Sequence, residues 1–212
     1  MKPRILLADD HRIVAEGLRS LLEPEFELVG IVEDGRALVD ASEKLRPDVI
    51  IVDISMPLLN GIEAVRQIKK ENKDIKVIFL TMHPDVTYAV SALEAGAQGY
   101  VLKHSAPSEL TTAVRKTLRG KTYITPLLEN EIMASRHMGS AERREAPSHL
   151  TRRQREVLQL LAEGYLAKEI ADKLNISSRT VEYHKYQMMK DLGLKTAADL
   201  IRYAVKHHIV SE

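Results

Sequence analysis

Five short apolar runs, rich in β-branched residues, alternate along the first 122 residues with stretches of helical apolar spacing. Runs that are apolar at nearly every position predict strands buried on both faces, as in a parallel sheet covered by helices. The chain therefore favours an α/β fold. We expect a flavodoxin-like (βα)5 domain over residues 1–122 with strand order 2-1-3-4-5. The five runs are Arg4–Asp9, Phe26–Val32, Asp48–Asp53, Lys76–Thr81 and Gly99–Lys103.

The segments between the runs supply the covering helices. Their apolar residues recur at i, i+3 and i+4, which is the spacing of one helical face. For the first helix, the face that we expect to pack on the sheet comprises Ile13, Val14, Gly17, Leu18 and Leu21.

Charged and polar side chains end four of the predicted strands. Asp9 and Asp10 end the first, Asp53 the third, Thr81 the fourth and Lys103 the fifth. In open parallel sheets these carboxyl ends form the ligand crevice, so we expect the three carboxylates to converge and to hold Mg²⁺. One carboxylate could then attack phosphorus, while Lys103 and Thr81 hold the phosphoryl oxygens. Any single acid here could instead be a helix N-cap or a solvated loop residue. The presence of all five residues at four strand ends favours a phosphoryl-transfer site over these alternatives.

Residues 148–212 show four helical patterns and no strand, which predicts a small all-helical domain. They carry eleven Lys and Arg against eight Asp and Glu, a balance that permits nucleic-acid binding. In one helix the stripe Val181, His184, Met188 and Leu192 suits the core, while the opposite face is polar and aromatic. A short helix, a tight turn and such a two-faced helix are typical of major-groove binding.

The stretch 123–147 separates the two domains. Its second half is charged and contains small residues and Pro, which favours a flexible linker. Its first half could form a helix with Leu127, Leu128, Ile132 and Met133 inward.

The composition excludes several classes of protein. The chain has no Cys, so disulfides and thiolate metal sites are ruled out. No apolar run approaches the roughly 18 residues of a membrane span. Asp9 and Asp10 interrupt the short apolar stretch that a signal peptide would need. We therefore expect a cytoplasmic protein that does not enter a membrane.

Four segments of residues 1–122 resemble the receiver domain of two-component response regulators. They read "LLADDHRIVAEGL", "DVIIVDISMPLLNGIEAVRQIK", "VIFLTMH" and "GAQGYVLK". The resemblance implies that a sensor histidine kinase phosphorylates Asp53 and that Lys103 pairs with the phosphoryl group. It also implies that Asp10, Asp53 and the backbone carbonyl of Ser55 ligate Mg²⁺, with Asp9 acting largely through water.

The same resemblance implies a switch in which Thr81 moves toward the phosphoryl group and Tyr100 changes rotamer with it. An ordinary strand aromatic is an equally good interpretation of Tyr100. We also hypothesise that Ser55 and His83 tune the phosphoryl lifetime, with His83 influencing water access. The alternative is that His83, which precedes Pro84, only starts the fourth helix.

Residues 150–194 resemble the LuxR-type helix-turn-helix, so the whole chain resembles a NarL/FixJ-type response regulator. The second helix of that motif reads bases with its exposed N-terminal residues, here Glu182, Tyr183 and Tyr186. Neither Arg nor Lys stands there, so a bidentate contact to guanine is not evident. The remaining DNA contacts that we expect, mostly to phosphates, are Lys168, Arg179, Thr180, Lys185 and Lys190.

These observations predict a DNA-binding transcriptional regulator switched by Mg²⁺-dependent phosphorylation of Asp53. We do not expect an enzyme, apart from a possible capacity for self-phosphorylation and autodephosphorylation. The expected partners are a sensor histidine kinase, double-stranded promoter DNA and a second copy of the chain, with RNA polymerase as a further candidate. One alternative is a DNA-binding regulator that partner proteins control without phosphorylation. A phosphohydrolase with an Asp nucleophile is disfavoured, because it usually places a second acid where Ser55 stands and this chain has no lid insertion.

Overall fold

The computed structural model describes residues 1–129, 131, 150–207 and 209–210. The chain divides into two compact units, Met1–Met138 and Gly139–Glu212. The predicted boundaries at residues 122 and 147 stay predictions. Most of the predicted linker, including Ile132 and Met133, lies outside the described residues. None of the described helices combines the length and the apolar composition that crossing a membrane requires.

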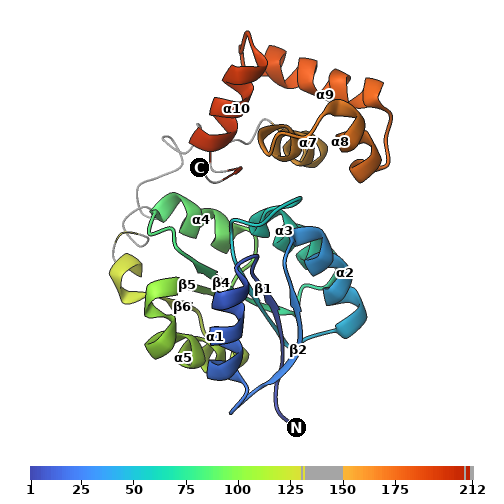
Figure 1. Ribbon diagram of the computed structural model, residues 1–212. Coiled ribbons are helices and arrows are strands. Elements are labelled where there is room, and N and C mark those ends of the chain that lie inside the picture. The colour runs from blue at the N-terminus through green and yellow to red at the C-terminus, as the bar shows by residue number, and fades with distance from the viewer. Residues whose placement is uncertain (130, 132–149, 208, 211–212) are drawn as a thin grey trace. The chain divides into compact units, whose positions relative to one another are not determined.

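The N-terminal unit is built on one parallel sheet, whose strand order is β2-β1-β3-β4-β5-β6 (Figure 1). The predicted α/β fold and the predicted order of the first five strands are therefore confirmed. The strands are β1 Arg4–Ala8, β2 Glu27–Val32, β3 Val49–Val52, β4 Lys76–Thr81, β5 Gly99–Leu102 and β6 Tyr123–Ile124. The helices are α1 Arg12–Leu22, α2 Gly35–Leu45, α3 Gly61–Glu71, α4 Val86–Glu94 and α5 Ala106–Leu118, with a 3-10 turn at Lys103–Ser105.

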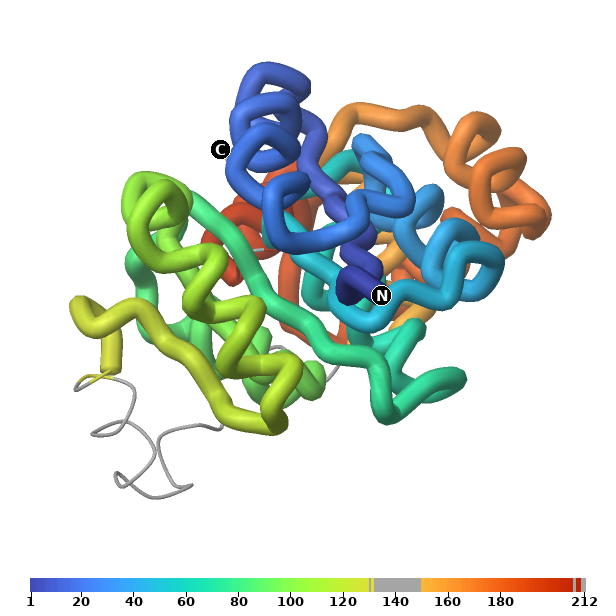
Figure 2. The backbone as a smooth tube through the Cα atoms, turned by 90° about the horizontal axis from the view of Figure 1, so that it is seen from below, coloured from blue at the N-terminus to red at the C-terminus, as the bar shows by residue number. Residues whose placement is uncertain are grey.

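Each face of the sheet has its own apolar core. One core packs alternate strand residues such as Phe79 and Tyr100 against α2, α3 and α4. The other packs residues such as Ile51 and Val101 against α1 and α5. Figure 2 shows this division, with α1 in dark blue and α5 in yellow-green on one side of the strands and α2 in light blue on the other. Both faces of β3 are consequently buried, as its apolar sequence predicts.

The face predicted for α1 is partly wrong. Ile13 is 91% exposed and Gly17 is exposed too, while the buried residues of the helix are Ala15, Leu18 and Leu22. At 100° per residue, Ile13 lies on the far side of the helix from Leu18 and Leu22. The true stripe therefore runs through Ala15 rather than through Ile13.

The sixth strand was not predicted. β6 pairs in parallel with β5, and Thr125 directly after it is held to the same strand twice. Its backbone N–H donates to the Tyr100 carbonyl at 2.9 Å, and its hydroxyl oxygen accepts from the Leu102 N–H at 3.2 Å. The hydroxyl also donates to Glu109 of α5 at 2.9 Å. This buried threonine thus fixes the segment that follows α5 to the sheet.

Residues 126–129 after Thr125 are helical, in agreement with the prediction of a partly helical segment. Leu128 is buried as predicted, whereas Leu127 is exposed, so the prediction that both pack inward is wrong for Leu127. Neighbouring residues on a helix are 100° apart, so Leu127 and Leu128 do not face the same way.

The C-terminal unit is all-helical in its described residues, with α7 Arg152–Ala162, α8 Ala167–Leu174, α9 Ser178–Asp191 and α10 Ala197–Lys206. Its core contains Leu158, Ile170, Val181 and Met188, all fully buried. The predicted stripe on α9 is confirmed, with His184 and Leu192 half-buried at its margin.

The turn between α8 and α9 has the expected chemistry. Asn175 ends α8 in the left-handed conformation, which Asn tolerates better than most residues. The Ser177 hydroxyl then caps α9 by accepting from the Thr180 N–H at 3.1 Å.

Candidate metal centre and nucleic-acid interface

Three carboxylates meet at the carboxyl edge of the sheet in the N-terminal unit. Asp9 and Asp10 follow β1, and Asp53 follows the neighbouring strand β3. Ligand atoms of Asp9, Asp10, His11 and Asp53 all lie within 4.8 Å of one another. Asp9 and Asp53 are buried, at 1% and 4% exposure. The convergence that adjacent strand ends predict is therefore present.

Lys103 joins two of these acids. Its ammonium lies 2.7 Å from Asp9 Oδ2 and 2.7 Å from Asp53 Oδ2, and its side chain is 8% exposed. Asp53 Oδ1 accepts from the Ile54 N–H at 2.7 Å. Burial raises the pKa of Asp53, although Lys103 and the Ile54 N–H act in the opposite direction. Burial lowers the pKa of Lys103, but Asp53 and Asp9 together outweigh it, so that pKa is raised as well.

The residues of this cluster fit a divalent cation. One ammonium cannot neutralise three carboxylates, so an excess of negative charge remains. In the described part of the chain, Asp10 Oδ1 is shielded from solvent and receives no hydrogen bond, although the His11 ring Nδ1 is 2.7 Å away. Carboxylate oxygens are hard ligands of the kind that Mg²⁺ prefers.

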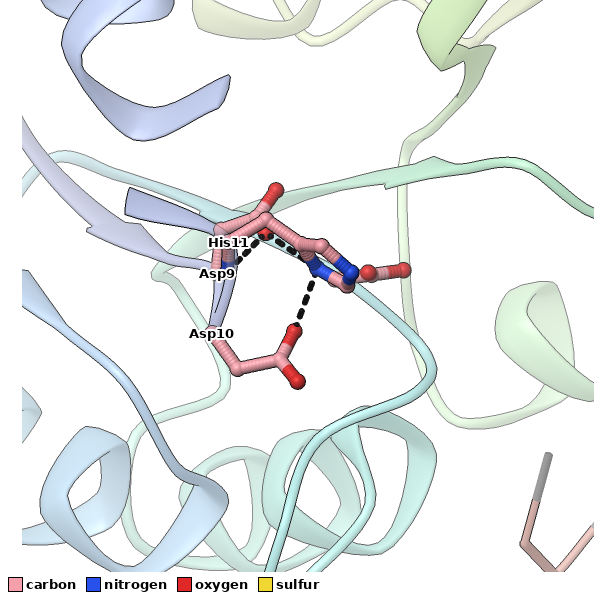
Figure 3. Close-up of side chains that lie close together, drawn as sticks. Asp9, Asp10 and His11 are labelled. Atoms are coloured by element: carbon pink, nitrogen blue, oxygen red, sulfur yellow. Dashed lines mark hydrogen bonds and ion pairs between the residues drawn. The ribbon is translucent and has the colours of Figure 1, made fainter. Parts of the chain in front are cut away.

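His11 was missed in reading the sequence, although it follows the two acids directly. It stands at the N-cap of α1 without a side-chain capping bond. Figure 3 shows its ring turned toward both neighbouring carboxylates, with Nδ1 at 3.3 Å from Asp9 and 2.7 Å from Asp10. Asp9 accepts from the His11 N–H at 2.9 Å and is not the N-cap itself. The N-cap interpretation of Asp9 is thus wrong.

His83 contacts the other three residues proposed to switch or tune the site. Its N–H donates to Thr81 Oγ1 at 3.2 Å, and its carbonyl accepts from the Tyr100 hydroxyl at 2.8 Å. Its ring Nε2 lies 2.9 Å from the Ser55 hydroxyl. Burial raises the pKa of Tyr100, so the phenol remains a donor.

The contacts around His83 also test the alternative that this residue only starts the fourth helix. The N-cap of α4 is Asp85, whose side chain accepts from the Thr87 N–H. The interpretation of His83 as only a helix start is therefore wrong, and its ring instead stacks on Tyr88 with centroids 4.5 Å apart.

The outer face of α9 carries the residues that the sequence assigned to base reading. Tyr183 and Tyr186 are 59% and 65% exposed. Glu182 is exposed beside them and forms an ion pair with Lys185 at 3.3 Å.

The other predicted DNA contacts differ in exposure. Lys168, Arg179 and Lys190 are exposed, while Thr180 and Lys185 are half-buried. Thr180 also shares a 2.8 Å hydrogen bond with the Ser177 hydroxyl at the start of α9. Burial lowers the pKa of the half-buried His184, with Arg153 adding to the effect, in keeping with its core position.

Comparison with family models identifies both units. Residues 5–115 match the response regulator receiver domain. Residues 148–204 match the luxR family of bacterial regulatory proteins.

Two relatives match this chain over nearly the whole length of both proteins. The chain is 36% identical to the transcriptional regulatory protein DegU of Brevibacillus brevis, over 97% of this chain and 94% of that protein. It is 35% identical to the oxygen regulatory protein NreC of Staphylococcus aureus, over 98% of this chain and 99% of that protein.

Among solved structures, the chain resembles RcsB of Salmonella enterica serovar Typhimurium bound to promoter P1flhDC in the presence of the phosphomimetic BeF3-. The identity is 33% and the TM-score 0.60, over 96% of this chain and 98% of that chain. A LuxR-family two-component response regulator from Aurantimonas sp. SI85-9A1 is 36% identical with a TM-score of 0.61, over 64% of this chain and 99% of that one.

Proposed function

This chain belongs to the two-component response regulators that carry a LuxR-type DNA-binding domain, and on that basis we propose that phosphorylation of Asp53 controls its binding to promoter DNA. A sensor histidine kinase supplies the phosphoryl group, and the protein acts in the cytoplasm. The observation that carries the proposal is the contact of one buried ammonium, Lys103, with both Asp53 and Asp9.

In the proposed transfer, an Asp53 carboxylate oxygen bonds to phosphorus as the bond to the donor breaks. Lys103 already lies 2.7 Å from Asp53 Oδ2 and would balance the negative charge that the phosphoryl oxygens bring. Asp9, Asp10, Asp53 and the Ser55 carbonyl would hold Mg²⁺, with Asp9 acting largely through water. The bound ion would offset charge on the transferring group.

The proposed switch begins at Thr81. Turning its hydroxyl toward the phosphoryl group gives up the bond from the His83 N–H. The His83 carbonyl also holds Tyr100, so a shift of this loop changes contacts at both residues. Phosphorylation can shift the populations of two conformations only if the contacts of the phosphoryl group differ between them. The shifted state would dimerise and bind double-stranded promoter DNA, with RNA polymerase as a further candidate partner.

Mass spectrometry of the full chain tests the phosphoacceptor. Acetyl phosphate with Mg²⁺ should add one phosphoryl group to the wild type and none to Asp53→Asn. The exposed Asp40→Asn is a matched control and should be modified like the wild type. An adduct that survives in Asp53→Asn, or no adduct on any form, would refute the proposal.

A second experiment addresses His83, whose ring lies 2.9 Å from the Ser55 hydroxyl. We propose that this pair controls how water reaches the phosphoryl group, so His83→Ala should change the rate of autodephosphorylation. Equal rates in the variant and the wild type would exclude this role.

The alternative of control by partner proteins without phosphorylation makes the opposite prediction in cells. Asp53→Ala should then retain wild-type transcriptional activity. The burial of Asp53 beside Lys103 favours the phosphorylated mechanism, because a lysine-paired buried carboxylate is costly to keep for structure alone.

A further inference from the structure

The outward face of α9 places an acceptor-only group among the residues proposed to read bases. Glu182 is the fifth residue of the helix, and a recognition helix contacts base edges with its N-terminal residues. Its side chain is 55% exposed. Tyr183 and Tyr186 beside it are also largely exposed, so this face is not occupied by packing within the unit.

A carboxylate in the major groove discriminates strongly among bases. Guanine offers it two acceptors, N7 and O6, and thymine offers the O4 acceptor, so both repel it. Adenine pairs its N6 donor with the N7 acceptor. Cytosine alone offers a donor, N4, with no acceptor on the same base.

From this chemistry we infer that Glu182 makes the protein select a cytosine in each half of its DNA site. The inference rests on the proposed role of α9 in DNA binding. It specifies which base this helix would select. It also explains how a regulator without Arg or Lys at these outward positions can be selective, since rejection of the other bases provides the discrimination.

Lys185 reduces the repulsion that the Glu182 carboxylate would experience near the DNA phosphates. It lies one helical turn along and pairs with Glu182 Oε2 at 3.3 Å. The pair is partly exposed, so it holds the carboxylate only weakly. The charge of Lys185 offsets repulsion between Glu182 and the DNA backbone, while Oε1 can accept from a base.

Selection from random double-stranded DNA tests the inference with the full chain, treated with acetyl phosphate and Mg²⁺. Wild-type sites should contain a required cytosine, and replacing it should weaken binding about 5-fold to 150-fold, as expected for about 1–3 kcal/mol of discrimination. Glu182→Ala should lose the preference at that position alone. Glu182→Gln should admit adenine there, because an amide can both donate to N7 and accept from N6.

Asp191→Asn is the matched control, since it removes one negative charge from the exposed end of the same helix. It should leave the selected sequence unchanged. Wild-type sites without a required cytosine, or a cytosine still required by Glu182→Ala, would overturn the inference. Should no variant, phosphorylated or not, bind any DNA, the proposed role of α9 itself would fall, and with it the inference.

Discussion

Replacing Lys103 with Met should destabilise the N-terminal unit, because it removes the cation between two buried acids. The ammonium lies 2.7 Å from a carboxylate oxygen of each, Asp9 and Asp53. Methionine has a similar length and flexibility, so it fills the space without the charge. The change therefore isolates the electrostatic contribution of Lys103.

The magnitude follows from the burial of the three groups. Removing one partner of a buried ion pair costs about 3–5 kcal/mol, since the remaining charge is left unpaired. Asp53 limits this cost because burial already raises its pKa, and it can take up a proton instead. We therefore expect a loss of about 3 kcal/mol in the free energy of unfolding at about pH 8.

The pH dependence has a defined sign. Lys103 acts to lower the pKa of Asp53, so its removal raises that pKa further above the ordinary value of 3.8. A carboxyl group with a raised pKa in the folded state binds its proton more tightly when folded than when unfolded. The variant should thus gain stability as the pH falls through the folded pKa, and its deficit should shrink at about pH 5.5.

Added Mg²⁺ should rescue the variant. At about ten times its dissociation constant, the ion adds about 1.4 kcal/mol to the wild type. It should add more to Lys103→Met, where no ammonium competes for the same carboxylates.

Urea unfolding followed by circular dichroism would measure these differences, in EDTA and in Mg²⁺ at both pH values. The exposed Lys70→Met is the control and should match the wild type. Wild-type stability of Lys103→Met in EDTA at about pH 8 would refute the reasoning, as would a deficit that grows at lower pH.

Leu166→Thr should stabilise the C-terminal unit by about 0.5–1 kcal/mol, because the N-cap of α8 now has no side-chain oxygen; calorimetry should show a higher melting temperature than for Leu166→Ala. Thr125→Val should cost the N-terminal unit about 1–3 kcal/mol in urea unfolding, because it leaves a buried strand N–H unpaired. Thr125→Ser should restore most of that loss. Gly61→Ala should slow phosphoryl transfer about tenfold to a hundredfold in a mass-spectrometric time course, because the added Cβ would lie 2.0 Å from the Asp53 carbonyl oxygen. Gly17→Ala, with open space around it, should react at the wild-type rate.

The sequence predicted two kinds of feature: strands with a periodic apolar pattern, and site residues that stand at the ends of those strands. Five apolar strands were long enough to show their pattern, and the order of parallel strands then placed Asp9 beside Asp53. β6 has only two residues, which are held to β5 by backbone pairing and by the neighbouring Thr125, so no periodicity could reveal it. The error at Ile13 came from grouping apolar neighbours without checking their angles around the helix.

Side-chain contacts at the site depended on tertiary structure. Ser55 and His83 follow different strands, and their hydrogen bond exists only because β3 and β4 are paired. His11 could have been suspected from its position after two acids, but the direction of its ring is set by the loop. Lys103 was identified at a strand end, whereas its equal distances to two carboxylates required the folded sheet.

The hydrogen bond from the Leu102 N–H to the Thr125 hydroxyl links the end of β5 to the segment that follows α5. Leu102 is bonded covalently to Lys103, and Thr125 begins the stretch of chain that continues toward the helical unit. A displacement of the lysine backbone can therefore reach that stretch through the hydrogen bonds of Thr125, without passing through a side-chain core. Two hydrogen bonds of Thr125 carry this coupling, one from the Leu102 N–H to its hydroxyl oxygen and one from its own backbone N–H to the Tyr100 carbonyl.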